Sequence, residues 1–303
     1  MAVNRRRAIS KWGLILLTFL CITEISLRKY GFCDAVLMRE DSAYEYIAIP
    51  QDRHRFGKHI FYNSFSQRNP EPDKSDSIRI CAFGDSFING GAALDNDSLA
   101  TNKLSKYFTA KAKKPVKVLN ISAGSWGPDN CYAYLMKHGD FGSKQFILFV
   151  SSHDAYDDIN FQKVVGINRQ YPDRQYKLAI VELTERYIIP RLLSFGNMNE
   201  DAEINKQQYS TIFNTGFLNF RNYCDKNDID FTVYLHAAKT ETIEHNNSVQ
   251  GKQIIAFCKE NKIKFINELD FNFPLSVYRD SIHFNDEGQE RLFEELRNFI
   301  VIK

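Results

Sequence analysis

Two hydrophobic patterns alternate along the chain from Ile78 onward. Short apolar, β-branched runs alternate with longer segments whose apolar residues recur every three or four positions. The predicted strands cover residues 78–84, 116–122, 145–152, 229–237 and 263–269. The predicted helices cover residues 98–114, 128–139, 249–262 and 286–302. This order predicts an α/β fold, a three-layer α/β/α sandwich around a flavodoxin-like, five-stranded parallel sheet.

Three further regions surround this pattern. Residues 31–77 are predicted to form an extended linking region with short strands, which ends in the polar surface loop "RNPEPDKSDS". The domain that follows covers residues 78–303 and contains a helical insertion at 160–227, with helical patterns around 175–194 and 203–226. The insertion is a place for a lid or for substrate contacts. Its aromatic and basic residues either face an anionic or glycan ligand or lie on a solvated helix face. They are Tyr171, Arg174, Tyr176, Arg186, Tyr187 and Arg191.

The N-terminal segment 1–30 carries three arginines, at positions 5–7, before an uncharged run from Trp12 to Thr23. That run is shorter than the roughly 20 residues of a usual membrane span, although Lys11 and Glu24 can extend it toward Leu27. We predict an uncleaved, single-pass membrane anchor with a cytoplasmic tip, which places the rest of the chain on the periplasmic or extracytoplasmic side. A cleaved signal peptide and a packed cytosolic helix are the alternatives.

Charge and cysteine content narrow the function classes. The 303-residue chain has 39 Lys and Arg against 37 Asp and Glu, so its net charge of +2 gives no reason to expect a nucleic-acid partner. The six cysteines contain no CxxC pair and no short metal-binding spacing, which indicates buried free thiols, with one or two disulfides possible. No cofactor and no metal are predicted.

Unusual polar groups follow the predicted strands. Ser86 comes after the first strand in "FGDSFINGG", residues 120–127 follow the second, and residues 151–154 follow the third. Ligands of open parallel sheets bind beyond the carboxyl ends of the strands. Asp280 and His283 stand three residues apart just before the last helix. A serine hydroxyl needs a base to remove its proton and a third group to orient that base, so Ser86, His283 and Asp280 are the predicted catalytic residues.

These motifs resemble the GDSL/SGNH hydrolase family. The nucleophile stands in "FGDS" near the start of the domain, and the acid and base stand in "DSIH" near its end. The resemblance covers about 225 residues, from Ile78 to the C-terminus. It implies a serine esterase that acts on acyl esters, with acetylated carbohydrates common among the substrates.

The resemblance also implies an oxyanion hole made by the nucleophile's own N–H, a glycine N–H and an asparagine side chain. Gly124 and Gly127 are both available, but the family glycine falls nearest Ser125, so Ser86, Ser125 and Gly127 are named as candidates. In "VSSHDAYDD", His153 occupies the place of the asparagine. A neutral imidazole still donates one N–H, but the departure is also compatible with a slow or repurposed enzyme.

Some polar residues near the strand ends have a second interpretation. Asp154 and His236 are named as substrate-binding candidates, although a satisfied structural histidine explains His236 as well. The acidic residues around His153 resemble a metal cluster, but carboxylates at such junctions are commonly caps and turns.

Three functions fit these residues. The first is an esterase that removes O-acetyl groups from a cell-envelope or extracellular polysaccharide. The second is an O-acetyltransferase that uses the same triad with a sugar hydroxyl in place of water. The third is a non-catalytic glycan-binding or assembly protein.

Overall fold

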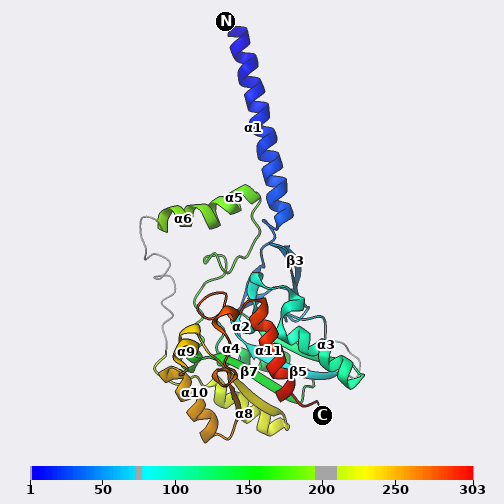
Figure 1. The fold of residues 1–303 in the computed structure, drawn as a ribbon, viewed down its shortest axis with the longest axis vertical. Coiled ribbons are helices and arrows are strands. Elements are labelled where there is room, and N and C mark those ends of the chain that lie inside the picture. Colours follow the sequence, from blue (N-terminus) through cyan, green and yellow to red (C-terminus); the bar gives the residue numbers. More distant parts are fainter. Residues whose placement is uncertain (1, 73–76, 195–209, 303) are drawn as a thin grey trace.

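The computed structural model describes residues 2–72, 77–194 and 210–302. Its centre is a five-stranded sheet in which every strand pair is parallel and the strand order is β6-β5-β7-β8-β9 (Figure 1). The strands are β5 (Ile78–Gly84), β6 (Val116–Ser122), β7 (Gln145–Ser151), β8 (Asp230–His236) and β9 (Lys264–Asn267). Counted within the sheet, this is the flavodoxin-like order 2-1-3-4-5. The predicted α/β sheet with flanking helices is confirmed.

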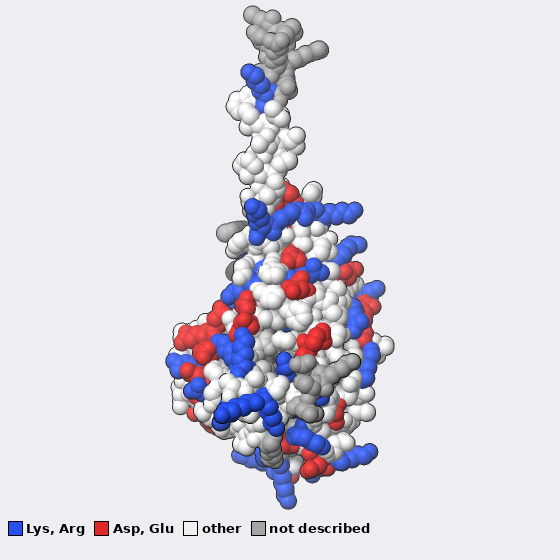
Figure 2. All heavy atoms as spheres, turned by 90° about the vertical axis from the view of Figure 1, so that its right-hand side faces the viewer, with Lys and Arg blue, Asp and Glu red and all other residues white. Residues whose placement is uncertain are grey.

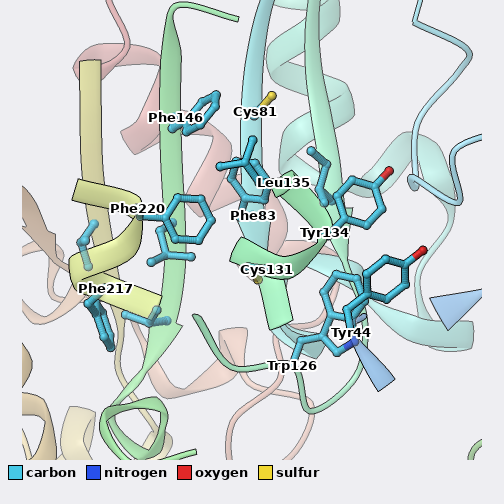
Figure 3. Packing of buried hydrophobic residues seen from close by; sticks show 14 of the residues in the cluster. Tyr44, Cys81, Phe83, Trp126, Cys131, Tyr134, Leu135, Phe146, Phe217 and Phe220 are labelled. Carbon is cyan, nitrogen blue, oxygen red and sulfur yellow. The ribbon is translucent and has the colours of Figure 1, made fainter. Parts of the chain in front are cut away.

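Helices cover both faces of the sheet because successive residues of each strand point to opposite sides. Cys81 and Phe83 of β5 belong to one apolar cluster, and Ile80 and Ala82 belong to the other. The first cluster, part of which Figure 3 shows, is covered by α4 (Pro128–His138), α8 (Gly216–Asn227) and α10 (Val249–Glu260). The second is covered by α3 (Ala100–Ala112) and α11 (Asp286–Phe299).

The remaining short helical elements lie mostly in the connections of the sheet. They are α2 (Ser86–Asn89), α9 (Lys239–Glu244), η1 (Gly91–Ala93), η2 (Asn96–Ser98), η3 (Ser152–Ala155), η5 (Glu268–Phe271) and η6 (Leu275–Val277). All six cysteines are free, and four of them are buried.

Two β-hairpins precede the sheet in the chain. They are formed by β1 (Met38–Asp41) with β2 (Glu45–Ala48) and by β3 (Gln51–Arg55) with β4 (Lys58–Tyr62). Tyr44 and Tyr46 bury their rings in the cluster that also contains Trp126, and the Trp126 indole donates to the Tyr46 carbonyl at 3.0 Å. The first hairpin is therefore packed against the sheet domain.

The segment predicted as a helical insertion has two parts in space. Residues Ala179–Leu183 form α5, a π-helical turn follows at Thr184–Ile188, and α6 covers Ile189–Ser194. The second predicted pattern begins at residue 203, outside the described residues. Its described part becomes α8, where Phe217 and Phe220 are fully buried against the sheet.

Helix α1 (Ala2–Tyr30) projects from this body (Figure 1), and its segment between Lys11 and Glu24 forms an uncharged column (Figure 2). The predicted membrane anchor, and the single-pass extracytoplasmic location that depends on it, are wrong. Within the described residues, no helix combines the length and the apolarity that crossing a bilayer requires. The uncharged run has only 12 residues, and Glu24 ends it by accepting hydrogen bonds from the backbone N–H groups of Ala179 and Ile180 at the start of α5.

Candidate active site

Ser86 stands at the carboxyl end of β5, on the first residue of α2. The Asp85 side chain caps this short helix by accepting from the Phe87 N–H at 2.8 Å. The helix ends at Gly90, whose φ of 72° lies in the left-handed region. A Cβ at Gly90 would lie 2.8 Å from Leu99 Cδ2 and 2.9 Å from Leu94 Cδ1. The "GDSFING" sequence thus forms a tight turn with Ser86 at its start.

Asp280 and His283 lie in the loop between η6 and α11. The Asp280 carboxylate accepts from the backbone N–H groups of Ile282 at 3.0 Å and His283 at 2.8 Å, which folds the loop into a turn. The same carboxylate lies 2.9 Å from His283 Nδ1, through Oδ2. On the other side of the ring, His283 Nε2 lies 2.8 Å from Ser86 Oγ. The three predicted residues therefore lie in one hydrogen-bonded chain, although 197 positions separate Ser86 from His283.

This arrangement keeps Asp280 ionised. Burial works against ionisation, but the backbone N–H groups of His283 and Ile282 and the His283 imidazole together lower the pKa of Asp280 to about 2. A carboxylate bonded to Nδ1 leaves that nitrogen as the donor, so Nε2 is the acceptor that faces the Ser86 hydroxyl. The geometry is that of a nucleophile, a general base and an orienting carboxylate.

His236 is fully buried beneath this chain of residues and does not line the pocket at Ser86. Its ring stacks on Phe87 with 3.7 Å between centroids. Its Nδ1 lies 2.7 Å from Glu268 Oε2, and its Nε2 lies 2.6 Å from the Ile282 carbonyl oxygen. Both ring nitrogens face acceptors, an arrangement that favours the doubly protonated imidazolium. His236 thus contacts the residue after Ser86 and the residue before His283.

The candidate oxyanion donors lie in different surroundings. The Gly127 N–H caps α4 and already donates to Asn130 Oδ1 at 2.9 Å. Ser125 has a φ of 55°, and its Oγ lies 3.3 Å from the Tyr171 hydroxyl. Gly124, rather than either of these, lines the pocket that contains Ser86. Sequence spacing did not select Gly124, because counting from Asn120 pointed to Ser125.

His153 and Asp154 lie at the end of β7. His153 Nε2 is 3.5 Å from Asp154 Oδ1, and Asp154 Oδ2 accepts from the Ser151 N–H at 2.7 Å. Asp85, His153 and Asp154 each bring one ligand atom within 4.8 Å of the others, so these three could hold a metal ion. Burial, followed by the nearby charge of Asp85, raises the pKa of Asp154 well above its usual range. Asp154 is buried, so a substrate has no direct access to it.

A pocket of about 190 Å³ opens beside Ser86. It lies between the N-terminal hairpins, the turn after β6 and the insertion. Its apolar wall consists of Ala35, Val36, Met38, Ala48, Ala92 and Ala123. Its polar wall includes Asn89, Ser122 and Gln170 besides Arg55, Tyr171 and Arg186. Of the six insertion residues singled out in the sequence, Tyr171 and Arg186 line this pocket, whereas Arg174 has an 88% exposed side chain.

No family model matches the chain, and no curated protein is significantly similar to it. Several solved structures are similar to it. A putative lipolytic protein of the G-D-S-L family from Desulfitobacterium hafniense is 13% identical, with a TM-score of 0.42 over 73% of this chain and 99% of that one. A two-domain esterase active on acetylated mannans is 9% identical, with a TM-score of 0.44 over 74% of this chain and 48% of that one. A psychrotrophic esterase from Pseudoalteromonas is 12% identical, with a TM-score of 0.41 over 73% and 94%.

The G-D-S-L family, which the sequence resembles, is named for more than one of the solved structures similar to this chain. At these identities and TM-scores, we infer the function from the geometry of the site alone.

Proposed function

We propose that the protein is a serine ester hydrolase with Ser86 as nucleophile, His283 as general base and acid, and Asp280 as the carboxylate that orients the imidazole. The observation that carries this proposal is the continuous hydrogen-bonded chain from Asp280 through both nitrogens of His283 to Ser86 Oγ. Ser86 lies at the carboxyl end of β5, and it lines a pocket of about 190 Å³, where ligands of parallel sheets bind.

The reaction follows from the roles of the three side chains. Ser86 Oγ attacks the ester carbonyl carbon while His283 Nε2 takes the hydroxyl proton, and a tetrahedral intermediate forms. Collapse of this intermediate breaks the bond to the leaving alcohol, which receives the proton from His283. Water then attacks the acyl-serine with His283 again as the base, which releases the acid and restores Ser86. Ionised Asp280 stabilises the imidazolium that forms in both steps.

The oxyanion of each intermediate needs donors near Ser86. The backbone N–H groups of Ser86 and Gly124 are our first candidates, because both residues line the same pocket. Ser125, Gly127 and His153 are less favourably placed, since Gly127 donates within its own helix and His153 lies beside Asp154. A pocket of about 190 Å³ suits a short acyl group, such as the acetyl group of an acetylated glycan.

Labelling with a serine-directed phosphonate, followed by peptide mapping, tests the proposal directly. We expect the label on Ser86, and no label in Ser86→Ala or His283→Ala. Hydrolysis of p-nitrophenyl acetate should fall by about 10⁴-fold or more in both variants, and Asp280→Asn should retain a small residual activity. Ser276→Ala is the matched control, because this hydroxyl lies outside the pocket and contacts Glu287. Full activity in a correctly folded Ser86→Ala protein would refute the assignment.

A further inference from the structure

The pocket beside Ser86 is lined by two basic side chains. Two of its lining residues, Arg55 and Arg186, carry a guanidinium group, whereas Asp and Glu are absent from the described residues that line it. The buried Glu182 lies behind the wall, with Oε1 2.5 Å from Arg55 Nη2 and 3.7 Å from Arg186 Nη1. The single negative charge of Glu182 is therefore shared by two guanidinium groups. Together the three side chains leave a net positive charge at this part of the pocket.

The two arginines have different surroundings. Arg55 is 3% exposed and also donates to the Gly31 carbonyl at 2.9 Å and the Tyr187 hydroxyl at 3.1 Å, so it supports the wall. The Arg186 side chain is 17% exposed. It donates from Nη2 to the Arg169 carbonyl at 2.7 Å, and its separation from Glu182 is longer than a hydrogen bond. Arg186 is therefore the cation that a ligand in the pocket can reach.

The charged residues that line the pocket at Ser86 are basic, whereas those that line the neighbouring hollow are mostly acidic. The adjacent hollow, of about 400 Å³, contains Glu40, Asp41 and Glu45 with a single cation, Lys163. Tyr46 lines this acidic hollow, and Tyr171 lines the basic pocket; their rings pack together with centroids 4.8 Å apart. For a chain whose net charge is only +2, this separation favours an anionic ligand on the Ser86 side of the two tyrosines.

We propose that Arg186 binds an anionic group of the ester substrate, a carboxylate or a phosphate, while the ester carbonyl lies at Ser86. This inference rests on the proposed hydrolase function and names the substrate class. A guanidinium offers two parallel N–H donors to such a group. The alanine, valine and methionine side chains of the wall fit the short apolar part of the substrate that connects the two ends.

Two matched ester pairs test the inference and distinguish where the anion stands. The first pair is p-nitrophenyl butyrate and the p-nitrophenyl monoester of succinic acid, which place a methyl or a carboxylate at the end of the acyl group. The second pair is 4-acetoxybenzamide and 4-acetoxybenzoate, which place the charge on the alcohol side. We expect kcat/KM for the anionic member to exceed that for the neutral member by about tenfold in one pair.

The ratio between anionic and neutral esters should fall toward one in Arg186→Gln and keep an intermediate value in Arg186→Lys. The ratio for the wild type should also fall as NaCl rises from 10 to 500 mM, because salt screens the attraction. The salt dependence is measured on the wild-type protein, so it does not rely on the folding of a variant. Arg174→Gln is the matched control on the same insertion, because the Arg174 side chain is 88% exposed; its ratio should equal that of the wild type.

Each outcome bears on one claim. If the neutral esters are cleaved but neither anionic ester is preferred, the anion inference is overturned and the hydrolase function stands. It is also overturned if Arg186→Gln lowers kcat/KM for both members equally, since that is the result of a structural role. If no ester is cleaved and the phosphonate does not label Ser86, the proposed function itself fails, and the substrate inference fails with it.

Discussion

Among single residues, His236 joins the two chain segments that the proposed triad requires. Burial disfavours its charged form, but the charge and hydrogen bond of Glu268 and the Ile282 carbonyl reverse this effect and raise the pKa of His236. The ring contacts the Ile282 carbonyl, next to His283, through Nε2, while its face packs on Phe87, next to Ser86. We therefore infer that His236 is a positioning residue for the proposed triad, because it contacts the neighbours of Ser86 and His283 and neither of these residues itself.

We expect His236→Gln to lower kcat by about 10- to 100-fold with little change in KM, because a small displacement between nucleophile and base is costly. Steady-state kinetics with a neutral ester measures this split. His138→Gln is the matched control, since His138 contacts Tyr44 and Tyr134 instead of the site. A rise in KM with kcat unchanged would instead indicate direct substrate contact.

The raised pKa of His236 predicts that the free energy of unfolding depends on pH. Its pKa is raised in the folded state, so its contribution is fully present below the ordinary histidine pKa of about 6.5 and is lost as pH rises through the folded pKa. Urea unfolding should show His236→Gln less stable than wild type by about 3 kcal/mol at pH 5.5, since Glu268 loses its buried partner. This difference should shrink at alkaline pH. A constant difference from pH 5.5 to 9 would exclude the charged form.

The raised pKa of Asp154 likewise predicts a free energy of unfolding that falls as pH rises, but here the substitution should stabilise the protein. Burial and the charge of Asp85 raise its pKa in the folded state, although the Ser151 N–H acts against them. Above about pH 4 the unfolded chain releases this proton first, so folding stability falls with rising pH. Asp154→Asn removes that decline. We expect the variant to gain stability relative to wild type between pH 5 and 8 in urea unfolding, whereas the partly exposed control Asp158→Asn should track the wild type.

At the scale of elements, Arg68 braces the turn that carries Ser86. Its side chain is fully buried. It donates to the carbonyls of Asn89, Gly91 and Leu94 and, at 3.1 Å, to Asn96 Oδ1. All four acceptors are neutral, and burial lowers the pKa of Arg68. This guanidinium therefore connects the end of α2, η1 and η2.

Arg68→Lys should destabilise the protein by about 3 kcal/mol, because an ammonium cannot reach four separated acceptors and leaves buried carbonyls unpaired. Chemical unfolding measures the loss. Arg53→Lys is the control: Arg53 forms a partly exposed ion pair with Asp34, and such pairs are worth about 1 kcal/mol or less. Equal effects of the two substitutions would contradict the bracing role.

The elements could be predicted from the sequence where local pattern and burial agree. The strands 78–84 and 116–122 begin and end where predicted, because their apolar residues fill both faces of a buried sheet. The start of "RNPEPDKSDS" reads as a surface loop, yet Arg68 and Asn69 are buried. Their partners are far along the chain, so composition gives no sign of them. Ser86, Asp280 and His283 form local motifs, whereas the position of His236 and the pocket contact of Gly124 depend on the tertiary packing.

At the scale of the whole molecule, helix α1 contacts α5 of the insertion (Figure 1). Glu24 accepts from Ala179 and Ile180 at 2.8 and 3.0 Å, and Arg28 Nη2 donates to the Lys177 carbonyl at 2.5 Å. Burial opposes ionisation of Glu24, but the two N–H groups and Arg28 lower its pKa. Because residues 170–172 and Arg186 line the pocket at Ser86, a contact with α1 helps to place the wall of that pocket.

We therefore expect Glu24→Ala to expose the start of α5 and to act on the pocket from a distance. Hydrogen exchange should become faster in residues 178–188 and remain unchanged in the strands of the sheet, since the lost cap is local to α5. KM for esters should rise severalfold, because the part of the pocket wall that contains Arg186 is held less firmly. The value of kcat should stay nearly constant, because the residues that position Ser86 and His283 are unchanged. The control Glu40→Ala removes a carboxylate from an exposed position on β1. If exchange in 178–188 is unchanged in Glu24→Ala while KM rises, the pocket wall is not held by α1, and the change in KM has another origin.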